Sequence, residues 1–263
     1  MELWALYATA AATVLTIVVV LWSISVAIRD ASIIDVFWGP LFVAIGWVLL
    51  TVQLDSATPK QLLVVLLVTL WGLRLGFHLG SRNLGTGEDT RYRIWRQHGG
   101  ANWWLTSLYR VYLLQGAIAL VVATPIVAAF RDDHPLEWVN WLGIPVWLAG
   151  FGIEAIADVQ LTRFRVRPDT AGAVLDVGLW RYSRHPNYFG DALQWWGLGL
   201  VTFSGVAWWS LVGPLVMTLV FVNLSNDVIE RGLKKRRPDY ARYIERTSAF
   251  FPKLPVSADD RRS

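Results

Sequence analysis

The densest group of chemically active side chains in this sequence lies between Gly178 and Asp191. These fourteen residues include two arginines, one histidine, two tyrosines, one asparagine and one aspartate. Guanidinium, imidazole, phenol and amide groups together can bind a charged small molecule that has several parts to recognise. The segment follows a basic loop and runs into an apolar stretch, so we expect a ligand site at a membrane boundary. Arg181 and Arg184 would face the anionic part of the ligand.

Two pairs of polar residues recur at helical spacing around this segment. Glu154 and Asp158 are four residues apart, and so are Asn187 and Asp191. Residues at i and i+4 share a helix face, and ionisable groups in apolar helices usually face a cavity or a partner. These residues therefore either contact a ligand or neutralise nearby arginines and lock the loop to the helices. None of the four histidines has ligand spacing to the acids, so we expect no metal.

Alternating arginines precede the segment at Arg163, Arg165 and Arg167. A guanidinium can bind two phosphate oxygens at once, so the run suits a nucleotide phosphate and also suits lipid headgroups. The sequence contains neither G-x-G-x-x-G nor G-x-x-x-x-G-K-[ST], and it therefore predicts neither a Rossmann nor a P-loop phosphate site. A dinucleotide would have to bind through a different architecture.

The elements that must position these residues are long and apolar. Hydrophobic residues make up 54% of the 263 residues, and 16 residues are tryptophan. A helix needs about 20 apolar residues to cross a bilayer. We therefore expect an all-α integral membrane bundle of seven transmembrane helices in one domain, 1–263. The expected spans are about 3–28, 36–54, 61–80, 105–129, 138–160, 189–204 and 206–226.

The distribution of positive charge orients this bundle. Seven spans would place 20 of the 24 lysine and arginine residues on one side of the membrane, and only Lys60 and Arg131 on the other. The positive-inside rule then puts the N-terminus outside and the tail, 227–263, in the cytoplasm. The formal net charge of +4 is therefore a topology signal, and no nucleic acid is expected as a partner. The site is expected to face the cytoplasm.

At these residues the sequence resembles the steroid 5α-reductase superfamily, particularly its bacterial members. The similarity covers most of the chain and is strongest from Glu154 to Pro252, including Gly178 to Tyr188 and Pro238 to Tyr243. It implies a seven-helix reductase of the bacterial inner membrane that holds NADPH in a cytoplasm-facing cavity. The partners it implies are a lipophilic small-molecule substrate and membrane lipid, and it leaves the oligomeric state open.

The resemblance also assigns cofactor residues. Four residues fall on positions that contact the cofactor in such reductases: Asp158, Arg165, Asn187 and Asp191. Arg163 joins Arg165 at the phosphates, and Asn187 would bind the nicotinamide amide. Proximity within the shared motif adds Arg181, Tyr182, Arg184, His185, Glu230, Tyr240 and Tyr243.

The sequence departs from the family pattern where animal enzymes hold the steroid carbonyl with a glutamate and a tyrosine. The matching position in the third span is Trp71, whose indole is not a useful proton source, and the second span has no equally placed glutamate. We therefore expect a lipophilic α,β-unsaturated carbonyl substrate that need not be a steroid. Tyr112 is the expected donor to its carbonyl oxygen, and Asp35, kept protonated by an apolar site, is the second choice. Gln115, Trp38 and Trp71 are expected to line the substrate pocket.

Two other functions fit the same motif. Integral-membrane methyltransferases of the isoprenylcysteine and phospholipid type share Arg184 to Tyr188 and use these residues to bind S-adenosylmethionine. The arginine run and Asp158 favour the larger, phosphate-bearing NADPH. A non-catalytic lipid-binding or scaffold protein is the third hypothesis.

Overall fold

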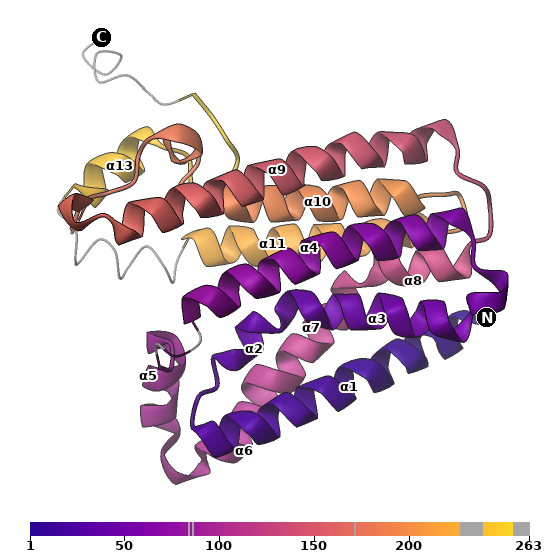
Figure 1. Cartoon of the computed structure of the whole chain (residues 1–263), viewed down its shortest axis with the longest axis horizontal. Coiled ribbons are helices and arrows are strands. Elements are labelled where there is room, and N and C mark those ends of the chain that lie inside the picture. Colours follow the sequence, from indigo (N-terminus) through magenta and orange to yellow (C-terminus); the bar gives the residue numbers. More distant parts are fainter. Residues whose placement is uncertain (84, 86, 171, 227–238, 255–263) are drawn as a thin grey trace. The chain divides into compact units, whose positions relative to one another are not determined.

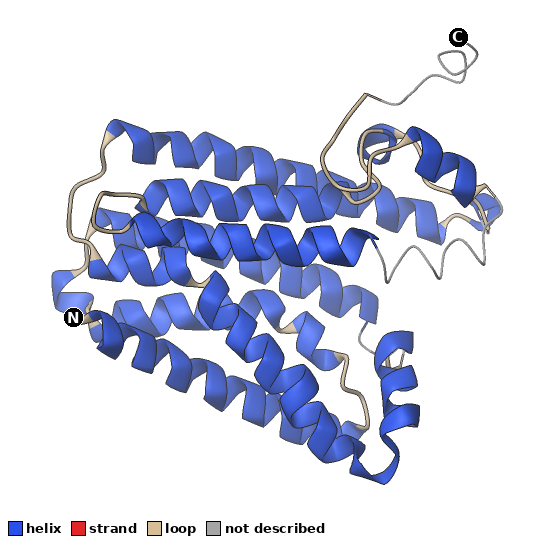
Figure 2. Ribbon diagram, turned by 180° about the vertical axis from the view of Figure 1, so that it is seen from behind, coloured by secondary structure: helices blue, strands red, loops and turns tan. Residues whose placement is uncertain are grey.

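The computed structural model describes residues 1–83, 85, 87–170, 172–226 and 239–254 (Figure 1). Helices make up 81% of it, and none of these described residues lies in a β-strand (Figure 2). The all-α prediction is confirmed. The chain divides into two compact units. Unit 1 comprises Met1–Glu137 and Val201–Gly213, and unit 2 comprises Trp138–Leu200 and Pro214–Ser263.

Unit 1 is built on the antiparallel pair α3 (Trp38–Val52) and α4 (Pro59–Asn83). A Cβ atom added to Gly39 would lie 2.4 Å from the carbonyl oxygen of Gly72, so the two backbones touch, as small residues allow between membrane helices. The other helical elements of unit 1 are α1 (Leu3–Ile28), α2 (Ile33–Val36), η1 (Leu54–Ser56), α5 (Thr90–Gly99), η2 (Gly100–Asn102), α6 (Trp103–Ser107), η3 (Leu108–Leu113), α7 (Leu114–Val122), α8 (Thr124–Arg131) and η6 (Trp208–Leu211).

The predicted span 105–129 is not one continuous helix. α7 ends at Val122, Ala123 departs from helical geometry and α8 begins at Thr124. Pro125 explains this break, because proline has no N–H to donate and is tolerated only in the first turn of a helix. The predicted span 105–129 therefore falls on helical elements that are interrupted at Ala123.

Four helical stretches of the described residues are long and apolar enough to cross a membrane: Leu3–Ile28, Pro59–Asn83, Thr90–Val122 and Trp138–Val166. The third stretch runs through α5, η2, α6, η3 and α7. Two further apolar helices are shorter, Trp38–Val52 and Trp208–Leu224. The predicted spans 36–54 and 206–226 fall on these shorter helices, and 189–204 falls on α10 (Pro186–Thr202), which has 17 residues. Helix length therefore supports a multi-pass membrane protein with four candidate spans, and it does not confirm the predicted seven.

A buried ion pair joins the start of α4 to the end of α8 in unit 1. Lys60 Nζ lies 3.0 Å from Asp132 Oδ2, and the two side chains are 4% and 1% exposed. His134 Nδ1 lies 2.5 Å from the other carboxylate oxygen of Asp132. Burial opposes the ionisation of Asp132, but the hydrogen bonds from His134 and Lys60 lower the pKa of its carboxyl to about 2. The two helix ends are thus tied by full charges.

Unit 2 is built on the close approach of α9 (Trp138–Val166) and α10. A Cβ atom added to Gly150 would lie 2.6 Å from the carbonyl oxygen of Gly190, and one added to Gly197 would lie 2.6 Å from the amide nitrogen of Trp147. No side chain fits between the helices at these glycines. The other elements are η4 (Pro168–Thr170), η5 (Gly178–Arg181), α11 (Val212–Asn226) and α13 (Tyr240–Arg246); residues 201–202 of α10 and 212–213 of α11 belong to unit 1.

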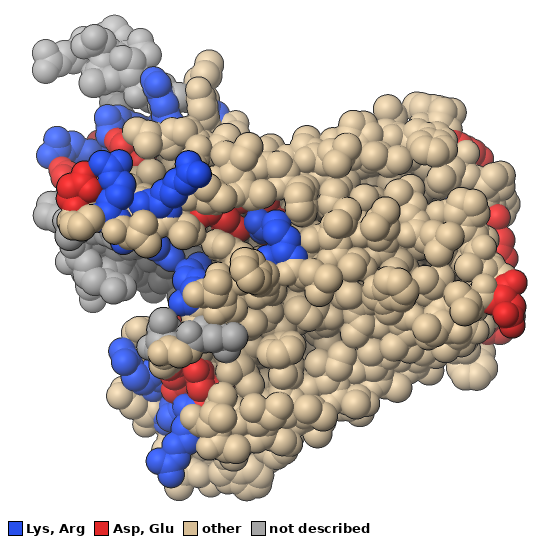
Figure 3. All heavy atoms as spheres, viewed as in Figure 1, with Lys and Arg blue, Asp and Glu red and all other residues tan. Residues whose placement is uncertain are grey.

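Positive charge gathers at helix ends within each unit. In unit 2 it lies where α9 finishes, and in unit 1 it lies around α5, whereas the long sides of the helices show few charged atoms (Figure 3). This pattern is typical of helices whose middle sections contact lipid, because a charge there is costly.

We predict that Asp132→Asn lowers the free energy of unfolding by about 3–5 kcal/mol, because it leaves the Lys60 ammonium buried without its counter-charge. The folded-state pKa of about 2 lies below the ordinary value of 3.8. The stabilisation is therefore fully present above about pH 4 and is lost as the pH falls toward 2. Melting temperature (Tm) in neutral detergent from pH 7 to 3 measures this. The exposed neighbour Asp133→Asn is the control, and an unchanged Tm for Asp132→Asn at pH 7 would contradict the prediction.

A second prediction concerns the glycines between α9 and α10. Replacing glycine by alanine inside a helix normally stabilises by about 0.5–1 kcal/mol, and Gly152, with nothing within 4 Å of its added Cβ, should follow this rule. At Gly190 the added Cβ would lie 2.5 Å from the Glu154 amide nitrogen. We therefore expect Gly190→Ala to lower Tm and Gly152→Ala to keep or raise it. Equal shifts in the two variants would show that close approach is not required.

Candidate functional site

Polar side chains of α9 and α10 meet across the closely packed helices of unit 2. Asn187 Nδ2 donates to Asp158 Oδ1 at 3.3 Å, and Gln194 Nε2 donates to Glu154 Oε2 at 2.6 Å. Glu154, Asp158 and Asp191 are 2%, 4% and 5% exposed. Three carboxyl groups are thus buried along one helix pair, where acidic residues are rare and are usually functional. We call these five residues the acid ladder.

The acid ladder unites the two pairs that the sequence singled out. Asn187 lies in the first turn of α10 and is half-buried, whereas Gln194 is fully buried. The ladder therefore becomes more accessible toward Asn187. Gln194 was not predicted, although residues 187, 191 and 194 follow the i, i+4, i+7 spacing of one helix face, and this spacing could have revealed it.

Exposed guanidinium groups stand at the same end of α9. Arg163 and Arg165 occupy its last turn, with both side chains exposed. Arg167 is paired with Asp169 of η4 at 2.6 Å. Arg181, in η5, is exposed as well. These residues can offer bidentate donors to an anionic group.

Arg184 fastens the loop before α10 to the C-terminal segment of unit 2. Its Nη1 donates to the carbonyl oxygens of Ile244 at 3.2 Å and Thr247 at 2.5 Å, and its backbone N–H donates to the carbonyl oxygen of Ser248 at 2.8 Å. Carbonyls at the end of a helix such as α13 lack partners within the helix, and a buried cation is a suitable donor to them.

Three neighbours complete this arrangement, which we call the tail clamp (Ser183, Arg184, His185 and Tyr243). Ser183 Oγ donates to the Phe250 carbonyl at 2.8 Å, His185 Nδ1 lies 3.0 Å from the Ala249 carbonyl oxygen, and Tyr243 OH donates to the Trp180 carbonyl at 2.5 Å. These bonds give Arg184, His185 and Tyr243 a structural role, and their predicted contact with a cofactor stays a prediction.

The remaining predicted cofactor residues differ in their surroundings. Tyr182 is exposed, and its carbonyl accepts a hydrogen bond from the Lys253 N–H at 3.0 Å. Tyr240 is buried with its ring centroid 5.8 Å from that of Tyr243. Glu230 lies outside the described residues.

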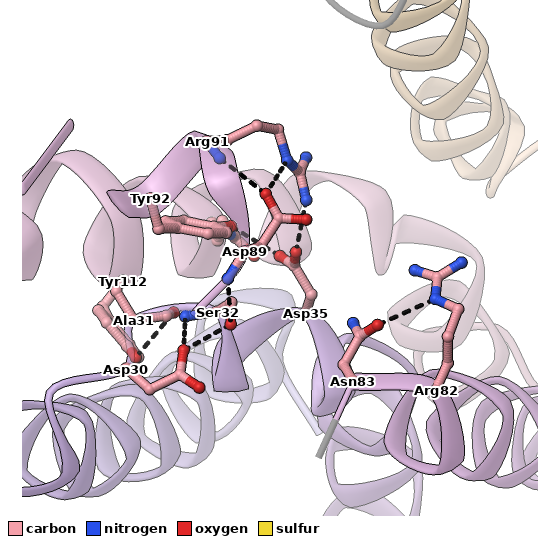
Figure 4. A network of polar contacts seen from close by, with 11 residues as sticks. Asp30, Ala31, Ser32, Asp35, Arg82, Asn83, Asp89, Arg91, Tyr92 and Tyr112 are labelled. Atoms are coloured by element: carbon pink, nitrogen blue, oxygen red, sulfur yellow. Dashed lines mark hydrogen bonds and ion pairs between the residues drawn. The ribbon is translucent and has the colours of Figure 1, made fainter. Parts of the chain in front are cut away.

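A second polar network lies in unit 1, around Asp35 on α2 (Figure 4). Asp35 Oδ1 accepts a hydrogen bond from Tyr92 OH at 2.7 Å, and Oδ2 accepts one from Arg91 Nη2 at 2.9 Å. Gln115 Nε2 donates to Tyr92 OH at 3.2 Å. Burial raises the pKa of the Asp35 carboxyl, and the charge of Arg91 and the Tyr92 hydrogen bond only partly oppose this rise. We call these four residues the Asp35 network.

An N-cap positions the two α5 residues of this network. Asp89 Oδ1 accepts hydrogen bonds from the Arg91 backbone N–H at 2.8 Å and from Arg91 Nε at 3.0 Å. This cap starts α5 at Thr90 and thereby aims Tyr92 and Arg91 at Asp35 (Figure 4). Residues 81–104 lie between two predicted spans, and Tyr92 was not among the predicted site residues, although an aspartate before Thr90 is a signal of a helix start.

Tyr112 is fully buried beside this network. Its hydroxyl donates to the Ala31 carbonyl at 3.2 Å, while the Ala31 N–H donates to Glu88 Oε1 at 2.9 Å. Burial opposes the ionisation of Glu88, yet the hydrogen bonds from Arg96 and Ala31 hold the pKa of its carboxyl below the usual range. Tyr112 thus holds the connection between α1 and α2, and its role as a carbonyl donor stays a prediction.

The two tryptophans predicted to line the substrate pocket belong to an aromatic cluster of α3 and α4. The ring centroid of Phe42 lies 5.2 Å from that of Trp38 and 5.7 Å from that of Trp71. Trp71 is fully buried and Trp38 half-buried. These contacts are those of core packing. They do not test the prediction that the two tryptophans contact the substrate.

The predicted site residues therefore form two groups. The acid ladder and the tail clamp belong to unit 2, whereas the Asp35 network, Tyr112 and the aromatic cluster belong to unit 1. Within unit 1 the structure brings Asp35 and Gln115 together through Tyr92. Within unit 2 it brings Asp158 and Asn187 together directly.

The residues of both groups lie within the part of the chain that matches a known protein family. A family model described as "Protein of unknown function (DUF1295)" matches residues 21–247. The chain is 24% identical over 269 residues to an uncharacterized protein of Schizosaccharomyces pombe, covering 90% of this chain and 77% of that protein. It is 31% identical over 98 residues to 3-oxo-5-alpha-steroid 4-dehydrogenase 1 of Macaca fascicularis, covering 37% of this chain and 35% of that protein.

A plant relative shows a similar match. Steroid 5-alpha-reductase DET2 of Arabidopsis thaliana is 30% identical over 97 residues, covering 35% of each chain. The alignments with the macaque and Arabidopsis proteins thus span only 35% of each relative's length. No solved structure matches the chain.

The tail clamp yields a prediction. Arg184→Gln removes a buried charged donor from two carbonyl oxygens and should lower the free energy of unfolding by about 2–3 kcal/mol. The C-terminal segment should then detach, and trypsin should cleave faster at Arg242 and Arg246. Limited proteolysis followed by mass spectrometry measures this. Arg181→Gln, an exposed position three residues away, is the control; equal cleavage rates in both variants would contradict the role of Arg184.

Proposed function

The chain belongs to the DUF1295 family, a steroid 5α-reductase-like family, and we propose that it is an integral membrane reductase that uses NADPH to reduce a lipophilic α,β-unsaturated carbonyl compound. Similarity to the named 5α-reductases supports a membrane oxidoreductase at the level of the family. The observation that carries the finer proposal is the acid ladder, because its buried carboxyl and amide groups suit a ligand rich in hydroxyl and amide groups.

The chemistry of unit 2 fits this cofactor. Asp158 and Asp191 offer acceptors for ribose hydroxyls, and Asn187 offers both an acceptor and a donor for the nicotinamide amide. Arg163 and Arg165 lie five and seven residues after Asp158 on the same helix, about 8–10 Å along its axis. Exposed guanidinium groups at that distance suit the phosphates of a dinucleotide.

Bound NADPH would supply a hydride to the β-carbon of the substrate. The electron pair of the C=C bond then moves toward the carbonyl oxygen, and one proton must reach the α-carbon. The protein must therefore provide a donor at the carbonyl oxygen, where negative charge develops. It must also orient the substrate and exclude water.

The Asp35 network can supply this donor. The Tyr92 hydroxyl, which donates to Asp35 Oδ1 at 2.7 Å, would turn to donate to a substrate carbonyl, while Asp35 would keep its bond to Arg91. Gln115, at 3.2 Å from Tyr92, orients the phenol. This proposal keeps Asp35 from the sequence prediction and adds Tyr92. Tyr112 could act only after it exchanges its bond to Ala31.

We extend the proposal to topology and location. Seven spans, with the N-terminus outside and the tail in the cytoplasm, would place 20 of 24 lysine and arginine residues on the cytoplasmic side, as the positive-inside rule requires. Arg163, Arg165 and the accessible end of the acid ladder would then face cytoplasmic NADPH. A bacterial inner membrane is the proposed location.

The methyltransferase alternative is not favoured. The named relatives include 3-oxo-5-alpha-steroid 4-dehydrogenase 1 and steroid 5-alpha-reductase DET2. The exposed arginines at the end of α9 also suit a phosphate-bearing cofactor, and S-adenosylmethionine has no phosphate.

The proposal is tested by titrating the purified full-length protein with NADPH, NADH and S-adenosylmethionine while following Tm. A ligand that binds only the folded state adds about 2.7 kcal/mol at 100 times its Kd, and we expect this response with NADPH. Asn187→Ala should abolish the NADPH response. A panel of α,β-unsaturated ketones, with NADPH absorbance as the readout, then tests for reduction.

The matched control is Asn223→Ala, an exposed asparagine of α11 whose Nδ2 donates to the Leu219 carbonyl of its own helix. This variant should keep the full NADPH response. A response to S-adenosylmethionine alone would overturn the reductase proposal, and no response to any of the three ligands would support a non-catalytic protein. If Asn187→Ala lowers Tm strongly without ligand, the acid ladder is a structural lock.

A further inference from the structure

A cavity of about 490 Å³ lies in unit 1 between the end of α1 and the segment formed by η2 and α6. Its lining includes two arginines, Arg29 and Arg96, and two tryptophans, Trp103 and Trp104. Arg29 and Trp104 are exposed, so the cavity opens to the surface. None of the lining residues belongs to the Asp35 network or the acid ladder, and the proposed reductase site does not use the cavity.

Arg29 is the informative residue of this cavity. It is the one non-glycine residue with a positive φ in the described part of the chain, at φ 56. This left-handed conformation is unfavourable for residues with a Cβ atom, and the position, at the C-cap of α1, is one where glycine is preferred. An arginine in this strained backbone conformation points to a use for its side chain.

The charge balance of the cavity leaves this arginine available. Arg96 Nη2 is paired with Glu88 Oε1 at 2.7 Å, and its guanidinium lies 5.6 Å from the ring centroid of Trp103. The backbone N–H of Arg29 donates to the Ser25 carbonyl, whereas its guanidinium has no hydrogen bond or ion pair to any residue in the described ranges. The cavity therefore carries one uncompensated positive charge at its mouth, which suits a single anionic group.

The apolar part of the lining indicates what the anion is attached to. Trp104 is 50% exposed, and its backbone carbonyl accepts a hydrogen bond from Trp22 Nε1 at 2.8 Å. The Trp22 and Trp104 ring centroids lie 6.2 Å apart. Tryptophans of this kind gather where a membrane meets water, so one side of the cavity is apolar and the other is cationic.

We propose that this cavity binds the phosphate head of an anionic phospholipid, with Arg29 as its bidentate donor and the indole rings against the glycerol and the start of the acyl chains. The cavity volume is large enough for a headgroup and its glycerol. Arg96, held by two hydrogen bonds to Glu88, forms part of the polar wall of the cavity. This binding differs from the general attraction of anionic lipids to a basic surface, because a single residue, Arg29, supplies the charge that binds the phosphate.

The test uses Arg29→Gly in the full-length protein in neutral detergent. Glycine adopts the left-handed conformation freely, so Tm should stay unchanged or rise while the guanidinium is lost. Binding of dioctanoyl phosphatidic acid, dioctanoyl phosphatidylcholine and inorganic phosphate is measured by native mass spectrometry. We expect phosphatidic acid to bind most tightly to the unaltered protein, and its affinity to fall about tenfold or more in Arg29→Gly.

Two further variants sharpen the result. Arg29→Lys keeps the charge and should retain part of the affinity, and Arg93→Gln, an exposed α5 arginine outside the cavity lining, should retain all of it. Unchanged affinity in Arg29→Gly would overturn the proposal, as would equal binding of phosphatidylcholine. Equal binding of inorganic phosphate would show a free-anion site and overturn the assignment to a lipid.

Discussion

Charged and polar side chains buried among apolar helices must find their partners inside the protein, because a lipid-facing helix offers no water to them. Several of the buried groups described above meet this constraint with a named contact. Lys60 meets Asp132, Glu154 meets Gln194, and Asp158 meets Asn187. These contacts fix the relative positions of the helices within each unit more specifically than apolar packing alone could do.

The glycines explain how such contacts become possible in unit 2. Gly150, Gly190 and Gly197 remove side-chain volume from the α9–α10 interface, so polar groups on the two helices can reach each other directly. Asn187 is the half-buried member of the acid ladder, and it lies where α10 begins, near the end of α9 that carries the exposed Arg163 and Arg165.

The polar segment 178–191 proves to have two roles within unit 2. Its first part, around Arg184 and His185, bonds backbone carbonyls of the C-terminal segment. Its second part contributes to the acid ladder: Asn187 bonds to Asp158 of α9, and Asp191 is buried.

The sequence alone determined the all-α membrane architecture, the positions of the long apolar helices and the two i, i+4 pairs, because apolar length and helical periodicity are local properties. The sequence placed Asp158 and Asn187 near one another only because both residues were expected at the cytoplasmic ends of their helices. It could not predict Tyr92 in contact with Asp35, because that contact joins residues 57 positions apart and depends on where Asp89 starts α5. It also missed the break at Ala123. Only the tertiary structure decided which polar groups pair. Two polar groups can pair only where their helices approach closely, and contacts at glycines from distant segments of the chain set that distance.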